Sequence, residues 1–404
     1  MYTGQKPESA IENPGQKMVQ SSSPSPVEQV SPEASAEKIP ARLLSLDAFR
    51  GATMALMVLV NTPGGPRSYG PLNHSEWNGW TITDTVFPSF LWIVGVAITL
   101  SLGNRIAGGI RKSRLFLQVL RRACVIFGLG LIVYAAPNFN LSTQRLMGVL
   151  QRIAICYLIA SAIYLTTRWR IQVVAIVALL VSYWLIMMLA PVPGYGAGDL
   201  AMGHNFANYV DSIVLGAHNY ANTKSWDPEG LISTLPSIAT ALFGVMAGHI
   251  LKLKRDLSER TTWLYLTGSI LIALGLICDI WLPINKKLWT SSFSLFMAGM
   301  DFVIFAGLVW LIDGRGYRRY ARPLVIMGMN AIAVYLASEL LEETLSLIHV
   351  GGPASPSVHE WIYQTLFAPL ASPRNASLAY AICYVLLMYA IAYGMYRKRW
   401  FLKA

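Results

Sequence analysis

Residues 85–103, with the sequence TVFPSFLWIVGVAITLSLG, decide the fold class of this chain. The stretch carries no charged side chain and, as a helix, is long enough to cross the roughly 30 Å of hydrocarbon in a bilayer. Because similar apolar segments recur along the chain, we predict an all-α, polytopic integral membrane protein with about ten transmembrane helices. The other predicted spans are residues 43–61, 115–134, 147–166, 171–190, 230–251, 262–281, 290–312, 323–347 and 377–396.

The composition supports a membrane protein. Of the 404 residues, 54% are hydrophobic and 13% are charged, whereas a soluble domain averages about 25% charged residues. A net charge of +11 would suit a nucleic-acid partner, but Lys and Arg occur in short runs between the apolar segments, as the positive-inside rule predicts. We therefore expect the lipid bilayer as a partner and no nucleic acid.

The basic residues also predict the sidedness of the chain. The links after the second, fourth, sixth and eighth segments and the C-terminus, with the adjoining span ends, together carry twenty Lys and Arg residues, against seven in the opposite links and their adjoining span ends. This bias predicts that both termini are cytoplasmic. Residues 1–40, rich in Ser, Pro, Glu and Gln, are expected to form a disordered cytoplasmic tail, and residues 41–404 a transmembrane domain.

The most informative link is the outer loop before residues 85–103, which contains LNHSEWNG at residues 72–79. A cluster of polar groups beside hydrocarbon is costly and therefore suggests a site. His74 is the candidate for chemistry, because an imidazole can take a proton from an attacking amine or hydroxyl, or accept an acyl group itself. The alternative is an interfacial histidine beside the belt residues Trp77 and Trp80.

Two neighbours of the loop are further candidates. Asn61, or a backbone amide of the glycine-rich turn at residues 63–66, could stabilise an oxyanion. Asp84 could contribute to the site or cap the following helix. Which of Glu76, Asp84 and Asn61 lies nearest to His74 is left open by the sequence.

Polar residues outside this loop are open to structural interpretations. Asp47 and Arg50, three residues apart, predict an ion pair on one helix face. Asp301 and Asn330 lie inside predicted spans, where polar residues are functional candidates or join helices. Residues 227–230, DPEG, have the composition of a helix start.

Several reaction classes lack support. The sequence has no GxSxG elbow, no HExxH pair and no Walker A loop, so nothing favours a hydrolase, zincin or NTPase. The outer histidines are scattered without i, i+4 pairing, and the four cysteines lack CxxC spacing. We therefore expect no metal site.

Several long blocks of the chain resemble, in order, the transmembrane catalytic region of the heparan-α-glucosaminide N-acetyltransferase family. The resemblance runs from about residue 43 to the end, and the matching blocks are LLSLDAFRGATMALMVLVN, LNHSEWNGWTITDTVFPSFLWIVGVAI, GVLQRIAICYLIA, NYVDSIVLGAHNY, DPEGLISTLPSIATALFGVMAGHIL, LWTSSFSLFMAGMD and GMNAIAVYL. The resemblance implies a membrane acyltransferase in which His74 is catalytic, with Asn61 and Asp84 at family positions near it.

The resemblance also implies the reactants. Acetyl-CoA would be the cosubstrate from the cytoplasm, and an amino sugar or glycan in the periplasm would accept the acetyl group on nitrogen or oxygen. The expected location is a bacterial inner membrane with the loop facing the periplasm, and a homodimer is a candidate assembly. The alternative function is a transporter or flippase for a sugar or lipid-linked glycan, which would use Asp301 and Asn330.

Overall fold

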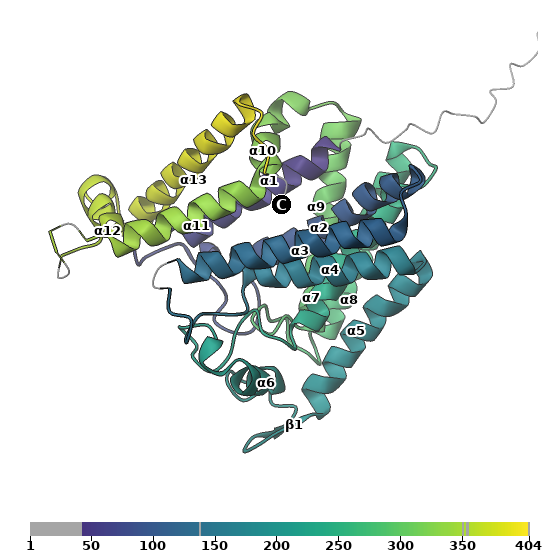
Figure 1. Cartoon of the computed structure of the whole chain (residues 1–404), viewed down its shortest axis with the longest axis horizontal. Coiled ribbons are helices and arrows are strands. Elements are labelled where there is room, and N and C mark those ends of the chain that lie inside the picture. Colours follow the sequence, from purple (N-terminus) through teal and green to yellow (C-terminus); the bar gives the residue numbers. More distant parts are fainter. Residues whose placement is uncertain (1–42, 137–138, 350, 353–354, 403–404) are drawn as a thin grey trace, which may run out of the picture. The chain divides into compact units, whose positions relative to one another are not determined.

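The computed structural model describes residues 43–136, 139–349, 351–352 and 355–402 (Figure 1). The predicted tail at residues 1–40 lies outside the described residues. The described part is mainly helical, with one small antiparallel hairpin formed by β1 (Pro191–Val192) and β2 (Gly196–Ala197). The all-α prediction is confirmed.

Within the described residues, nine helices are long and apolar enough to cross a membrane. Each begins and ends within a few residues of a predicted span, because hydropathy over about 20 residues is a local property of the sequence. They are α1 (Leu44–Asn61), α2 (Ile82–Ala107), α3 (Lys112–Ala135), α4 (Val149–Thr166), α5 (Trp169–Leu189), α7 (Thr234–Leu251), α8 (Leu257–Cys278), α9 (Ser291–Leu308) with its π-helical continuation η3 (Val309–Gly314), and α13 (Pro373–Arg397).

The remaining predicted span, residues 323–347, is broken. Helices α10 (Arg318–Met329) and α11 (Ala331–Leu347) meet at Asn330 with a bend of 66°, and together they satisfy the criteria for a single span. Asn330 lies in a non-helical conformation at the break, and its side-chain oxygen accepts a hydrogen bond from the amide of Leu402 at 3.4 Å. Asn330 therefore marks a break in the span and lies in no continuous helix.

Glycines allow two helix pairs to pack backbone against backbone. A Cβ on Gly95 of α2 would lie 1.9 Å from the carbonyl oxygen of Ala241 on α7, and one on Gly244 would lie 1.9 Å from that of Trp92. Gly51 and Gly328 bring α1 and α10 equally close. Such small-residue contacts are how helices associate where lipid removes the usual hydrophobic driving force.

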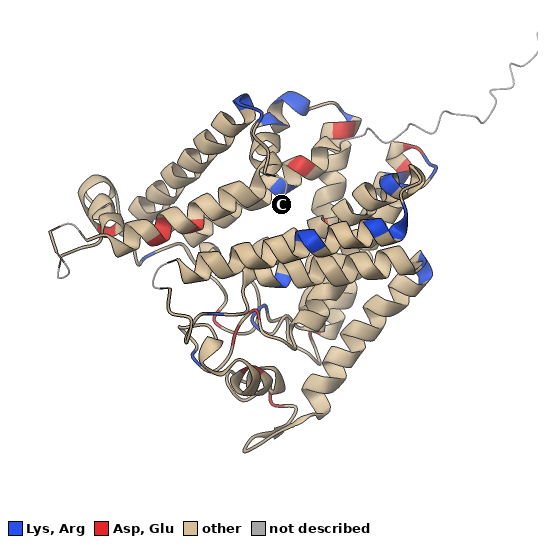
Figure 2. Cartoon of the chain, viewed as in Figure 1, with Lys and Arg blue, Asp and Glu red and all other residues tan. Residues whose placement is uncertain are grey.

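The short elements lie at one end of the helices and the basic links at the other. Figure 1 shows α6 (Phe206–Val214), the hairpin and α12 (Val358–Ile362) at the lower and left side. Lys and Arg gather at the upper and right ends of the helices in Figure 2. The link containing η1 (Gly70–Leu72) and His74 joins α1 to α2 at the end opposite these basic links.

Candidate active site

His74 and Asp84 are in direct contact. Nδ1 of His74 lies 2.7 Å from Oδ1 of Asp84, while Oδ2 of Asp84 accepts the backbone amides of Ser75 and Thr81, each at 3.0 Å. A carboxylate is an acceptor only, so the contact requires a hydrogen on Nδ1. In the neutral imidazole, the lone pair is therefore on Nε2.

Asp84 owes its position to the start of α2. Thr81 and Asp84 form the reciprocal capping box that begins this helix, which confirms the predicted cap. The Asp84 side chain is almost completely buried, whereas 48% of the His74 side chain is exposed. One carboxylate thus caps a helix and orients an imidazole whose other nitrogen faces outward.

The loop is held on both sides of His74. The hydroxyl of Thr81 donates to the carbonyl of Asn73 at 2.6 Å, and the indole nitrogen of Trp77 donates to the carbonyl of Leu200 at 3.0 Å. From the link between α8 and α9, Lys287 donates to the carbonyl of Glu76 at 2.6 Å. These contacts fix the backbone that carries His74.

Lys286 is a site residue that sequence reasoning missed. Its Nζ lies 3.1 Å from Nδ1 and 3.5 Å from Nε2 of His74, and 3.8 Å from Oδ1 of Asp84. Burial lowers the pKa of Lys286, and the carboxylates of Glu229 and Asp84 only partly oppose this effect. The sequence contains a feature that could have identified it: Lys286 and Lys287 are adjacent on the side where basic residues are rare, which departs from the positive-inside pattern.

Asn61 lies in a different environment from His74. Its amide donates to Oε1 of Glu339 on α11 at 3.3 Å. In the glycine-rich turn that follows, the amide of Gly64 donates to the backbone oxygen of Ser377 on α13. The amide of Gly65 donates to the hydroxyl of the same serine. These two amides are therefore already bonded and are not free oxyanion donors.

His204 forms a second histidine–carboxylate pair, on the β-hairpin side. Its Nδ1 lies 3.1 Å from Oδ2 of Asp199, and its ring stacks on Tyr195 with the ring centroids 3.9 Å apart. Both members of the pair are partly exposed, 42% for the His204 side chain and 34% for that of Asp199. Water competes for an exposed pair of this kind, so it orients the imidazole weakly.

His359 on α12 forms a third pair, in which both ring nitrogens are engaged. Nδ1 lies 2.7 Å from Oε1 of Glu342, and Nε2 lies 3.1 Å from the carbonyl oxygen of Gly64. The hydrogen bond to Glu342 raises the pKa of His359. His74 differs from both other pairs in that its carboxylate partner is almost completely buried while about half of its own side chain is exposed.

The predicted helix start at residues 227–230 was wrong. Helix α7 begins at Thr234, and Asp227 and Glu229 instead bind Arg145, whose guanidinium donates to Asp227 at 2.6 and 2.8 Å. Burial lowers the pKa of Arg145, but the two carboxylates outweigh burial and raise it. The acidic residues form a buried ion-pair cluster because an arginine far away in the sequence reaches them.

The other polar candidates have structural partners. The predicted pair of Asp47 and Arg50 is confirmed at 3.3 Å, and the hydroxyl of Ser89 donates to Asp301 at 2.5 Å, joining α2 to α9. Within the described ranges, no cluster of three or more His, Cys, Asp or Glu residues could hold a metal ion.

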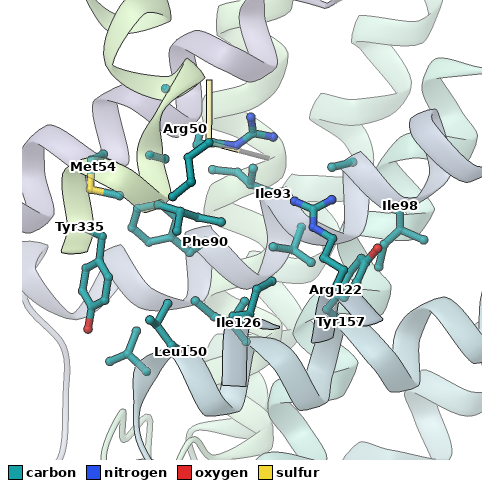
Figure 3. Close-up of a pocket in the computed structure, with 18 of the residues that line it drawn as sticks. Arg50, Met54, Phe90, Ile93, Ile98, Arg122, Ile126, Leu150, Tyr157 and Tyr335 are labelled. Atoms are coloured by element: carbon teal, nitrogen blue, oxygen red, sulfur yellow. The ribbon is translucent and has the colours of Figure 1, made fainter. Parts of the chain in front are cut away.

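A cavity of about 330 Å³ opens between α1, α2, α3, α4 and the bent pair α10–α11 (Figure 3). Its walls are mostly apolar, with Phe90, Ile126 and Leu150 among the lining residues. Arg50, Arg122 and Tyr335 also line the cavity. In Figure 3 the two guanidinium groups lie to the right of Tyr335.

The comparisons with known proteins agree on one family. The family model described as heparan-alpha-glucosaminide N-acetyltransferase, catalytic, matches residues 42–284. The heparan-alpha-glucosaminide N-acetyltransferases of Homo sapiens and Mus musculus are each 31% identical to the chain, over 361 and 358 residues. These matches cover 75% and 74% of this chain and 54% of each relative, so the chain spans about half the length of the curated relatives it matches.

Proposed function

Because the chain belongs to the heparan-alpha-glucosaminide N-acetyltransferase family, we propose that it is a membrane acetyltransferase that uses acetyl-CoA. The acceptor is an amino sugar or glycan on the side of the His74 loop. In this proposal the basic ends of the helices face the cytoplasm of a bacterium, and the loop faces the periplasm across the inner membrane. The charge distribution supports this orientation.

The observation that carries the proposal is the contact between Asp84 and His74 Nδ1, which leaves Nε2 as the basic nitrogen. In direct transfer, the acceptor amine adds to the thioester carbonyl carbon and Nε2 takes the proton that the amine loses. The C–S bond then breaks, and the CoA thiolate takes this proton back from Nε2. In the two-step alternative, Nε2 itself adds to the carbonyl carbon and the CoA thiolate leaves. The amine then adds to the acetyl carbon, the bond from this carbon to Nε2 breaks, and the freed Nε2 takes the proton that the amine loses and passes it to the thiolate.

The cavity supports acetyl-CoA as the donor. Small-molecule pockets typically enclose about 300–1,000 Å³ with mainly apolar walls, and the cavity between α1 and α4 fits this description. Arg50 and Arg122 suit the phosphates of CoA, and the apolar walls suit its pantetheine arm. Arg50 also contacts Asp47 at 3.3 Å, and Arg122 lies over the ring of Tyr157.

Asn61 is proposed as a polar contact for the acceptor at the outer end of α1. Its side chain is exposed, and its hydrogen bond to Glu339 leaves the amide oxygen available as an acceptor.

The test is transfer of radiolabelled acetyl from acetyl-CoA to glucosamine by the purified protein in detergent. We expect His74→Ala to abolish transfer and His204→Ala, at the exposed pair, to leave the rate within about threefold of wild type. In N-acetylglucosamine the nitrogen is already acetylated, so only the hydroxyl groups can accept acetyl, and a parallel reaction with this sugar separates N- from O-acetylation. Equal rates for wild type and His74→Ala would remove the proposed role of His74.

A further inference from the structure

Lys286 is brought to His74 by a rigid link. Two hydrogen bonds to Asn285 close the turn between α8 and α9. The amide of Leu288 donates to Oδ1 of Asn285 at 2.9 Å, and the amide of Thr290 donates to its carbonyl oxygen at 3.1 Å. The amide of Gly79 donates to the carbonyl of Ile284 at 2.7 Å, which fastens this turn to the His74 loop.

The residue Trp289 shows that the turn is strongly constrained. It is completely buried and adopts a φ of 51°, in the left-handed region that bulky side chains rarely occupy. Such conformations persist only where the surroundings enforce them, and they occur often at functional sites. The amide of Trp289 donates to the carbonyl of Lys286 at 3.0 Å, so the buried tryptophan is tied to the backbone that carries Lys286.

The contacts of Lys286 leave two of its three ammonium hydrogens available, because only Nε2 of His74, at 3.5 Å, can accept one. Nδ1 of His74 already carries the hydrogen that it donates to Asp84, so it cannot accept one from Lys286. Oδ1 of Asp84, at 3.8 Å, attracts the charge but is too far away for a hydrogen bond. A positive group that keeps donors beyond its contact to His74 thus lies 3.5 Å from Nε2, the nitrogen at which the chemistry occurs.

We propose that Lys286 is a catalytic residue that donates a hydrogen bond to the thioester carbonyl oxygen during acetyl transfer. As a nucleophile adds to the carbonyl carbon, the π electrons of the C=O bond move onto this oxygen and form an oxyanion. When the C–S bond breaks, these electrons re-form the C=O bond and the CoA thiolate leaves. Lys286 keeps its protons throughout and stabilises the negative charge while it exists.

The distances allow this role. When Nε2 is the nucleophile, the carbonyl carbon lies about 3–3.5 Å from it before attack, and an oxyanion donor acts at about 2.7–3.1 Å from the oxygen. With Nζ only 3.5 Å from Nε2, one carbonyl group can satisfy both conditions. This inference rests on the proposed acetyltransferase function and adds a residue that supplies charge to the transition state.

The experiment compares wild type with Lys286→Met, which removes the charge, Lys286→Arg, which keeps it, and Lys224→Gln, at an exposed lysine. The readouts are kcat and KM for acetyl-CoA, the pH profile and the melting temperature in detergent. We expect Lys286→Met to lower kcat by about 10²–10³ with KM and melting temperature unchanged. Lys286→Arg should recover part of kcat, and Lys224→Gln should match wild type.

The pH profile separates catalysis from a structural role. Burial lowers the pKa of Lys286, so the wild-type rate should fall at alkaline pH as the ammonium loses its proton. An arginine stays protonated, so Lys286→Arg should lack this alkaline decline. An unchanged kcat in Lys286→Met would overturn the inference, and if that variant misfolds, the same alkaline decline in Lys286→Arg would overturn it. If the wild type itself transfers no acetyl group, the proposed function fails and the role of Lys286 with it.

Discussion

At the scale of single residues, the site depends on one carboxylate with two tasks. Asp84 begins α2 through its capping box with Thr81, and it fixes the tautomer of His74 through Nδ1. Burial strengthens this second contact, because few water molecules compete for the carboxylate. The exposed pair of His204 and Asp199 has the same residue types without that advantage.

We predict that Asp84→Asn lowers kcat for acetyl transfer by about 10²–10⁴. The asparagine amide can donate to Nδ1, which would stabilise the tautomer that carries hydrogen on Nε2 and remove the basic lone pair there. The helix cap should survive, because the side-chain oxygen can still accept from the amide of Thr81, so the cost in stability should stay near 1 kcal/mol. Steady-state kinetics and thermal unfolding check both expectations. Asp199→Asn is the matched control, and equal losses in the two variants would contradict the assignment.

At the scale of elements, close helix contacts determine which helices are neighbours. Helices α2 and α7 are the most buried of the candidate spans, and α3, α5, α8 and α13 are the least buried. Gly95 and Gly244 lie at the contact between α2 and α7, where any larger side chain would meet a carbonyl oxygen. The helix that carries Asp84 is thus anchored at the centre of the fold.

We predict that Gly95→Ala destabilises the protein by about 1–3 kcal/mol or more, because the added Cβ would lie 1.9 Å from the carbonyl oxygen of Ala241. Gly128→Ala in α3 is the matched control: no atom lies within 4 Å of its added Cβ, and alanine favours a helix by about 0.5–1 kcal/mol over glycine. Thermal unfolding in detergent should therefore move in opposite directions for the two variants. An unchanged melting temperature of the Gly95→Ala variant would contradict the close packing of α2 against α7.

At the scale of the whole molecule, the basic links and the candidate active site occupy opposite ends of the helices. The links rich in Lys and Arg lie at one end of the helices (Figure 2). The His74 loop joins α1 to α2, and the other end of α2 leads into one of these basic links. The cavity with Arg50 and Arg122 lies between α1, α2, α3 and α4, within the bundle. This arrangement suits an enzyme whose donor and acceptor come from different sides of a membrane.

We predict that a cysteine placed at exposed Ser225 is labelled by a membrane-impermeant maleimide in intact bacterial spheroplasts. A cysteine at Lys254 should be labelled only after permeabilisation, because the positive-inside rule places that link in the cytoplasm. The chain with only its four native cysteines gives the background. The reverse labelling pattern would place the His74 loop in the cytoplasm and contradict the proposed orientation.

The sequence by itself determined the spans, the bias of basic residues and the loop that holds His74. A helix in hydrocarbon must satisfy its own backbone and present apolar side chains along its length, so each span is visible locally. Only the tertiary structure decided that Asp84, and neither Glu76 nor Asn61, contacts His74, and that Lys286 joins them from 212 residues away. It also showed that Arg145 converts an apparent helix start into an ion-pair cluster. The reason is physical: span formation depends on neighbouring residues in the chain, whereas side-chain contacts depend on which helix ends packing brings together.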